Sequence, residues 1–117
     1  MPLKRTVKVE VSSVKKSLGR FRRAVKTRAA QGEFVSFENL DTLLKTLTGK
    51  RWELLRALQG REPMSIRALA RELERDVKNV HTDIQVLVEI GLVEKAGRRI
   101  RVPFDEIRAE FVVRKAA

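Results

Sequence analysis

Four polar side chains recur at helical spacing after Asp76, namely Lys78, Asn79, Thr82 and Gln85. On a helix with 100° per residue, Thr82 points away from the apolar side and the other three flank it. That apolar side consists of Val77, Val80, Ile84, Leu87 and Val88. Asn and Gln amides pair bidentately with adenine, Thr offers a hydroxyl and a methyl group, and Lys reaches guanine or a phosphate. The set predicts a helix that reads base edges in DNA, although any amphipathic helix also has a solvated polar face.

The neighbouring segments favour the DNA-reading interpretation. Ser65 to Leu73 has the apolar spacing of a short helix, and Glu74 to Asp76 forms a tight break before the next one. After Gly91, the segment Leu92 to Val102 has the pattern of a two-stranded hairpin, in which Gly97 supplies the positive φ of the turn. The sequence therefore predicts a helix-turn-helix at residues 65–90, followed by a wing at residues 92–102.

The hairpin and the helix ends also offer contacts to the DNA backbone. Arg98 and Arg99 fall at the hairpin tip, where two guanidinium groups can enter a minor groove or bind phosphates. The alternative is a surface hairpin whose arginines serve only solubility. His81 is expected at the edge of the apolar side, and Asp83 is expected to pair with an arginine, Arg71 being the candidate. The residues predicted for the backbone and the wing are Ser65, Arg67, His81, Arg98, Arg99 and Arg101.

The charge of the chain indicates a polyanionic partner. Its 117 residues carry 26 Lys and Arg against 15 Asp and Glu, a formal net charge of +11 with a pI near 10.9. Residues 1–31 hold ten Lys and Arg against the single acid Glu10, or +9, which leaves +2 for the rest. Nucleic acid and an anionic membrane surface both fit such a charge. The basic residues expected on the outer face of an N-terminal arm are Lys15, Lys16, Arg20, Arg22, Arg23, Lys26 and Arg28.

Missing residue types exclude several kinds of chemistry. The chain has no cysteine, which excludes disulfides and thiolate metal sites, and His81 is its single histidine. We therefore expect no metal, no cofactor and no Ser-His-Asp triad, in a protein that is not an enzyme. Thr48-Gly49-Lys50 is not a phosphate-binding loop, because Leu44 stands where the first glycine of that motif would be. Without a long apolar stretch or an apolar leader, a cytoplasmic protein with no membrane partner is expected.

The remaining patterns predict a mainly α fold with a small β wing and an N-terminal strand-helix arm. Residues 6–11 alternate like a strand, and an apolar stripe from Val14 to Val25 predicts a helix ending near Gln31. The arm would comprise residues 1–31 and the winged helix-turn-helix domain residues 32–113.

Four further elements are expected inside that domain. Residues 33–37 predict a short strand, and residues 38–47 predict a helix with inward Leu40, Leu43, Leu44 and Leu47. Thr48 caps a helix at residues 49–59, whose core side carries Trp52, Leu55 and Leu58. Residues 104–113 favour a closing strand over a helix.

From Ser65 to Val102 the sequence resembles prokaryotic winged-helix transcriptional regulators of the MarR-like group. Segments 47–58, 65–73 and 80–93 resemble a small group of predicted archaeal and bacterial regulators, and some relatives of that group are described as antitoxins that repress their own operon. The resemblance covers residues 34–113. It implies a homodimer on a pseudo-palindromic operator, with the polar set of Lys78, Asn79, Thr82 and Gln85 in the major groove and the two tip arginines on the wing. Many such proteins have a glycine in the interhelix turn, where this chain has Glu74-Arg75-Asp76.

We therefore expect a sequence-specific, double-stranded-DNA-binding transcriptional regulator, a dimeric repressor. The alternative is an antitoxin, in which residues 6–30 dock to an acidic toxin protein and the same core autoregulates the operon. RNA binding by the arm ranks third, because Phe21 is the only aromatic residue among residues 1–33. Dimerisation is expected through apolar residues in excess of a small core, namely Val7, Val9, Val11, Leu18, Phe21, Phe111 and Val113.

Overall fold

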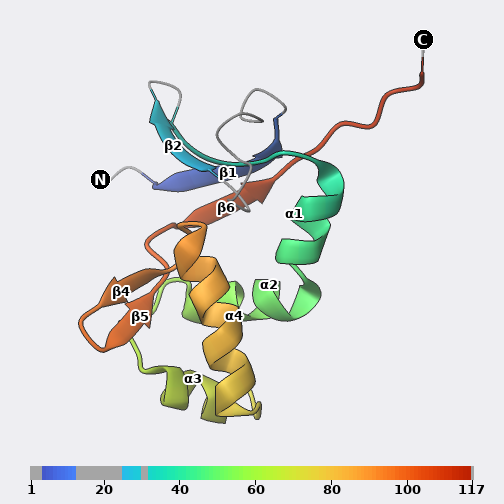
Figure 1. Ribbon diagram of the computed structural model, residues 1–117. Helices are drawn as coiled ribbons and strands as arrows, with labels where there is room; N and C mark the ends of the chain where they lie inside the picture. The colour runs from blue at the N-terminus through green and yellow to red at the C-terminus, as the bar shows by residue number, and fades with distance from the viewer. Residues whose placement is uncertain (1–3, 13–24, 30–31, 117) are drawn as a thin grey trace.

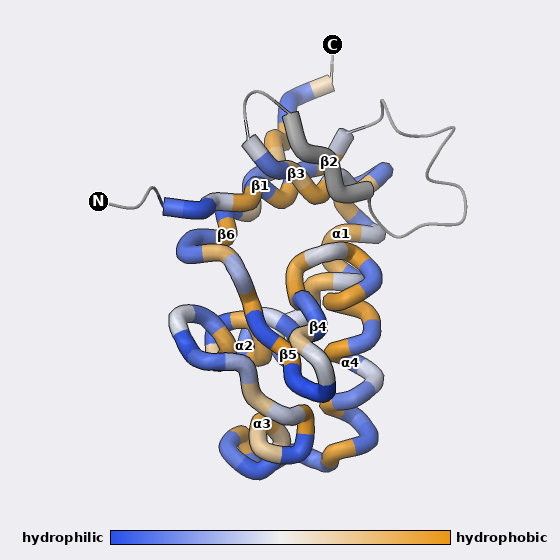
Figure 2. The backbone as a smooth tube through the Cα atoms, turned by 90° about the vertical axis from the view of Figure 1, so that its left-hand side faces the viewer, coloured by the Kyte–Doolittle hydropathy of each residue, from blue (hydrophilic) through white to orange (hydrophobic). Residues whose placement is uncertain are grey.

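The computed structural model describes residues 4–12, 25–29 and 32–116, with the backbone alone for residues 25–29. The first half comprises strands β1 (Thr6–Val11), β2 (Val25–Ala29) and β3 (Gly32–Phe37), then helices α1 (Leu40–Thr46) and α2 (Gly49–Leu58). The second half comprises helices α3 (Ile66–Glu72) and α4 (Val77–Glu89), then strands β4 (Glu94–Ala96), β5 (Arg99–Arg101) and β6 (Glu106–Ala109). Figures 1 and 2 show a sheet of β1, β2, β3 and β6 at one end, with α3 at the other.

The larger sheet joins the two ends of the chain. Its strand order is β2-β3-β1-β6, with β1 parallel to both β3 and β6, and with β2 antiparallel to β3. Val7 lies opposite Ile107, and Val9 lies opposite Ala109. Both valines are fully buried, because β1 is an interior strand whose apolar face is covered. The four helices of the described residues all lie in the chain segment that connects β3 to β6.

The predicted fold class is wrong. In the described residues the strand content is comparable to the helix content, and the three parallel strands β3, β1 and β6 define an α/β fold in place of a mainly α one. The N-terminal strand does not belong to a separate strand-helix arm, because it pairs on both sides within the sheet. Periodicity missed this arrangement because it reports only local pattern, whereas the residues opposite β1 lie 26 and 100 positions further along the chain.

The end of the predicted N-terminal helix is also wrong. Residues 25–29 form β2, in which Thr27 lies opposite Phe34. Val25 therefore lies in a strand and not at the end of a helix. β-branched Val25 and Thr27 alternate with basic residues, a pattern that suits a strand as well as a helix, and pairing with β3 decides between them. Lys26 and Arg28 therefore belong to a strand. The rest of the predicted helix lies outside the described residues, and with it lie Lys15, Lys16, Arg20, Arg22 and Arg23.

Local sequence accounts for where the helices begin. Each of the four described helices is preceded by a residue whose side chain accepts a hydrogen bond from the backbone three positions later. The predicted cap Thr48 is confirmed, with its hydroxyl 3.4 Å from the amide nitrogen of Arg51. The strands expected near residues 6–11 and 33–37, and the strand within residues 104–113, are confirmed as β1, β3 and β6.

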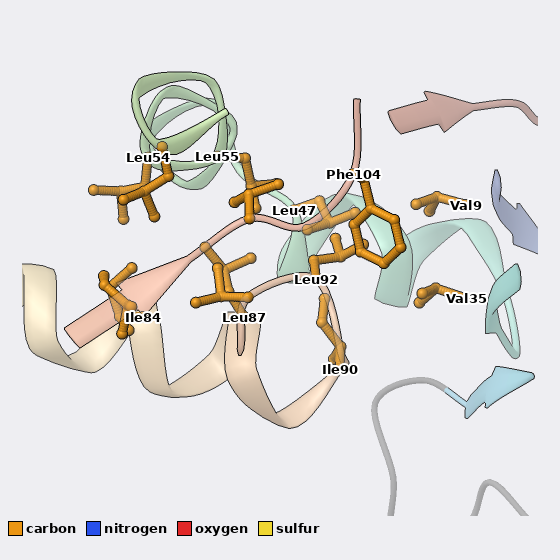
Figure 3. Close-up of a cluster of buried hydrophobic side chains, with 14 of the residues drawn as sticks. Val9, Val35, Leu47, Leu54, Leu55, Ile84, Leu87, Ile90, Leu92 and Phe104 are labelled. Carbon is orange, nitrogen blue, oxygen red and sulfur yellow. The ribbon is translucent and has the colours of Figure 1, made fainter. Parts of the chain in front are cut away.

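One apolar core connects the helices to the sheet. In Figure 3, Leu54 and Leu55 of α2 face Ile84 and Leu87 of α4, while Phe104 lies toward the sheet valines. In α1 and α2, two residues depart from the predicted core. Leu44 is 54% exposed, because α1 buries the side that carries Leu43 and Leu47. Trp52 is only partly buried at the margin of the cluster.

Candidate nucleic-acid interface

The polar side of α4 is open to solvent over its whole length. Lys78, Asn79, Thr82 and Gln85 are all exposed, whereas Val80, Ile84 and Leu87 on the opposite side are buried. The structure thus brings the four predicted base-contacting residues onto one accessible strip of a 13-residue helix. Val77, the first residue of α4, was expected in the core but is 40% exposed.

The polar side chains of this strip make few hydrogen bonds within the described residues. The Thr82 hydroxyl donates to the carbonyl of Lys78 at 3.1 Å, and the Gln85 amide nitrogen lies 3.4 Å from His81 Nε2. The backbone amide of Asn79 donates to Asp76, but its side-chain amide has no hydrogen-bond partner in the part of the chain that the structure describes. His81 is exposed and does not lie at the buried edge of the helix as expected. These groups can therefore bind a ligand without leaving a buried polar atom unsatisfied.

An aspartate clamp fixes the orientation of α4. Asp83 Oδ2 accepts from Arg75 Nη2 at 2.7 Å, and Asp83 Oδ1 accepts from Arg51 Nε at 3.0 Å. Arg51 also donates to the carbonyl of Thr46 at 2.9 Å. Burial raises the pKa of Asp83, but the hydrogen bonds from Arg75 and Arg51 outweigh it, so the pKa lies below its ordinary value. The clamp ties α4 to α2 and to the interhelix turn.

The expectation that Asp83 pairs with an arginine is confirmed in kind, but the predicted partner Arg71 is wrong. Arg71 is exposed, and the guanidinium groups that reach Asp83 come from Arg51 and Arg75. Sequence reasoning missed both. Arg75 precedes Asp83 by eight residues, about two helical turns, and this spacing is the one sequence signal that could have suggested Arg75 as a partner. Arg51 comes from a different helix, so no local pattern marks it.

The turn between α3 and α4 closes on a residue with left-handed backbone. The Arg75 amide donates to the Ala70 carbonyl at 2.9 Å, and the Glu74 amide donates to the Arg71 carbonyl at 3.2 Å, the two hydrogen bonds of a Schellman motif. Glu74 has φ 53° and is the one described non-glycine residue with positive φ. The chain therefore forms this turn without the glycine that many related turns contain.

Replacing Glu74 by glycine should stabilise the protein. The exposed carboxylate makes no hydrogen bond or ion pair within the described residues. Glycine avoids a left-handed cost of about 1–2 kcal/mol, partly offset by the greater freedom of glycine in the unfolded chain. We expect Glu74→Gly to raise the free energy of unfolding by about 0.5–1 kcal/mol in urea titrations. Gly60 has φ 69° and open space around its Cα, so Gly60→Ala should lower the same quantity by about 1 kcal/mol. A destabilised Glu74→Gly variant would contradict this account.

The β4–β5 hairpin is fixed to the start of α3. Met64 and Ile100 exchange backbone hydrogen bonds of 3.0 and 2.9 Å, and the Ile100 side chain is buried. Gly97 has φ 65°, which a first turn residue of a type II′ hairpin requires. Arg98 and Arg99 are exposed at the tip, as predicted, and the hairpin turn is strongly hydrophilic in Figure 2.

The other residues predicted to contact the DNA backbone differ in whether their polar groups are already bound within the protein. Ser65 caps α3 by accepting from the Ala68 amide at 3.0 Å, so its hydroxyl has a structural role. Arg67 is exposed on α3. Arg101 donates to Glu94 across the hairpin at 3.0 Å, which leaves Arg98 and Arg99 as the cations at the hairpin tip.

Other kinds of site find little support in the described part of the chain. No three His, Cys, Asp or Glu side chains gather there as metal ligands would. A shallow hollow of about 400 Å³ lies between α2 and the start of β6, lined in part by Trp52, Gln59 and Ile107. It is separate from the polar strip of α4. None of the four described helices has the length and apolar character needed to cross a membrane.

Comparison with protein families covers the region that carries this interface. Residues 46–109 match the HVO_A0114 family, which is more than half of the chain. The chain belongs to the HVO_A0114 family. The matched part runs from the end of α1 through β6, so it includes α3, α4 and the hairpin and leaves out β1, β2 and β3. No curated protein and no solved structure matches the chain.

Proposed function

We propose that this protein binds double-stranded DNA sequence-specifically as a dimeric transcriptional regulator, a repressor, acting in the cytoplasm. The observation that carries the proposal is the exposed strip of Lys78, Asn79, Thr82 and Gln85 on α4. These side chains offer the hydrogen-bonding groups that read adenine and guanine in the major groove. The likeness of residues 34–113 to prokaryotic regulators supports the same proposal.

The mounting of α4 suits insertion into a groove. A helix of 13 residues is about 20 Å long, and a major groove about 12 Å wide accepts one helix. The side of α4 opposite the polar strip packs on α2 and α3, and the Asp83 clamp fixes the rotation of α4 about its axis. Binding to DNA would therefore not cost additional entropy for ordering this helix. Arg98 and Arg99 would then bind the flanking backbone or a narrow minor groove.

The test separates base reading from backbone binding. A preferred duplex is first selected from a random pool, and affinities for it and for an unrelated duplex are then compared. Asn79→Ala and Thr82→Ala should each weaken the preferred duplex by about 1–3 kcal/mol and leave the unrelated one nearly unchanged. The control is Glu89→Ala in the last turn of the same helix, which should not weaken either duplex. Equal losses on both duplexes for the α4 variants would refute base reading.

In the part of residues 6–30 that the structure describes, no feature favours the antitoxin alternative. That alternative uses residues 6–30 as a segment that docks to a toxin. Within this segment β1 is already paired on both sides, with β3 and with β6, and its valines are buried. DNA binding by α4 and the hairpin is therefore the function that we favour.

A further inference from the structure

The strand pattern of β6 continues beyond the point where the strand ends. From Glu106 to Arg114 one face would carry Ile107, Ala109, Phe111 and Val113, while the other is mostly charged. This is the period-2 alternation of a strand with one apolar face. Glu106–Ala109 are paired as β6, opposite Thr6–Val9, and β1 ends only two residues later at Val11, so residues 112–114 have no partner residue in β1. The sequence therefore encodes a longer strand than the protomer can pair.

The outer edge of β6 has open hydrogen-bonding groups. The amides of Glu106 and Glu110 donate to Arg5 and Val9 carbonyls at 3.3 and 2.9 Å, so the even-numbered residues face β1. The alternation of a strand then directs the amides and carbonyls of Ile107, Ala109 and Phe111 outward. Among the described residues no strand pairs with that edge. An open edge of this kind is a template for another chain.

Three consecutive apolar side chains after β6, Phe111 to Val113, are exposed. Phe111 is 51% exposed and Val113 is 80% exposed, and Figure 1 shows the C-terminal segment leaving the body of the protein. In contrast, Val7 and Val9, which were also expected at a dimer interface, are fully buried in the core of the protomer. Among the described residues, three of the five large apolar side chains that are exposed, Phe111, Val112 and Val113, therefore lie after β6.

We propose that a second copy of this chain covers this edge, with β6 and the residues after it pairing antiparallel to the same segment of the copy about Ala109. In this register Arg108 lies opposite Glu110 of the copy, and Ile107 lies opposite Phe111 of the copy, each contact occurring twice by symmetry. Opposite charges and apolar pairs directly across an antiparallel ladder are both stabilising. The larger sheet would then run continuously through both protomers.

Charge and hydrogen-bond direction select this register. Outward-facing residues must meet outward-facing residues, so the two-fold axis has to pass through a residue of the strand. An axis at Arg108 would place Glu106 opposite Glu110 of the copy, and an axis at Glu110 would place that carboxylate opposite itself. An axis at Phe111 would place Arg108 opposite Arg114 of the copy. Axes at Ile107 and Val112 would also oppose unlike charges, Glu106 with Arg108 and Glu110 with Arg114. The first would confine the ladder to residues 106–108, and the second would leave the start of β6 unpaired. The axis at Ala109 is the one that combines complementary charges with a ladder along the whole of β6.

This inference rests on the dimer in the proposed function, but not on DNA binding. The chain has no cysteine, so a single introduced thiol reports the interface directly. Ala109→Cys in the full chain should form a disulfide with its copy under mild oxidation, because opposed residues lie within bonding range. The matched control is Glu106→Cys, which would lie about 20 Å from its counterpart and should stay monomeric on a non-reducing gel.

A second variant tests the apolar contact in solution. Phe111→Asp should weaken dimerisation about a hundredfold by sedimentation, because two buried phenylalanines are lost, each contributing about tenfold or more. Leu44→Asp, at a similarly exposed leucine on α1, should leave dimerisation unchanged. A monomeric wild-type protein, or a dimer in which Ala109→Cys does not cross-link, would overturn the interface. Cross-linking by a protein that binds no DNA would overturn only the proposed function.

Discussion

Raising the salt concentration from about 50 to 200 mM should weaken duplex binding by about a thousandfold or more. A dimer with two α4 helices and two hairpins would contact on the order of six to ten phosphates, and each contact releases a condensed counterion. The logarithm of affinity should then fall linearly with the logarithm of salt concentration. Fluorescence anisotropy with a labelled duplex gives this slope, and a flat line would refute nucleic-acid binding altogether.

The hairpin tip should account for part of this slope. Each lost phosphate contact makes the slope of log affinity against log salt concentration about one unit less steep. The double variant Arg98→Ala/Arg99→Ala should therefore lower the steepness of this slope by about two for every hairpin that contacts the duplex. Arg56 is an exposed cation on α2, beside Asp105 and Glu106, and Arg56→Ala is the matched control that should leave the slope unchanged. If the control and the tip variants changed the slope equally, binding would be diffuse and would not depend on the hairpin.

The sequence predicted best what depends on neighbours in the chain. The apolar spacing of α4, the cap at Thr48 and the positive φ at Gly97 are local properties, and the structure has each of them where they were expected. The exposed strip of α4 follows directly from that spacing. The predicted hairpin also has its arginines at the tip.

What the sequence could not supply depends on distant partners. The Arg5 amide donates to Asp105 at 2.8 Å across a hundred residues, which helps to place β6 beside β1. Arg5 also binds Glu33 and lies over the Phe104 ring, joining β1, β3 and the chain before β6. Periodicity could show that Thr6 to Val11 is a strand, but it could not show that this strand is interior. Because periodicity gives no information on contacts between residues far apart in the chain, it also did not indicate Arg51 as a partner of Asp83.

Asp83→Ala should lower the free energy of unfolding by about 2–4 kcal/mol. The Asp83 side chain is 16% exposed and accepts from two guanidinium groups, of which Arg75 is 17% exposed and already has its Nη1 buried without a partner. Removing the carboxylate leaves two partly buried cations without their counterion. The control is Asp41→Ala, because Asp41 and Lys45 form an exposed pair on α1 that should contribute only about 0.5 kcal/mol. Similar losses in both variants would refute the clamp.

The contribution of Asp83 should also depend on pH in a defined direction. Its pKa is lower in the folded protein than the value near 3.9 expected for an unfolded chain, so the carboxylate stabilises the fold above about pH 4. That contribution is lost as the pH falls through the lowered pKa, because protonated Asp83 no longer neutralises Arg51 and Arg75. Asp83→Asn has no titrating group at this position and cannot accept from both arginines through carboxylate oxygens. The difference in the free energy of unfolding between wild type and Asp83→Asn should therefore be constant from about pH 5 to 7 and shrink below about pH 4. A difference that stayed constant to about pH 2 would show that the charge of Asp83 does not stabilise the fold.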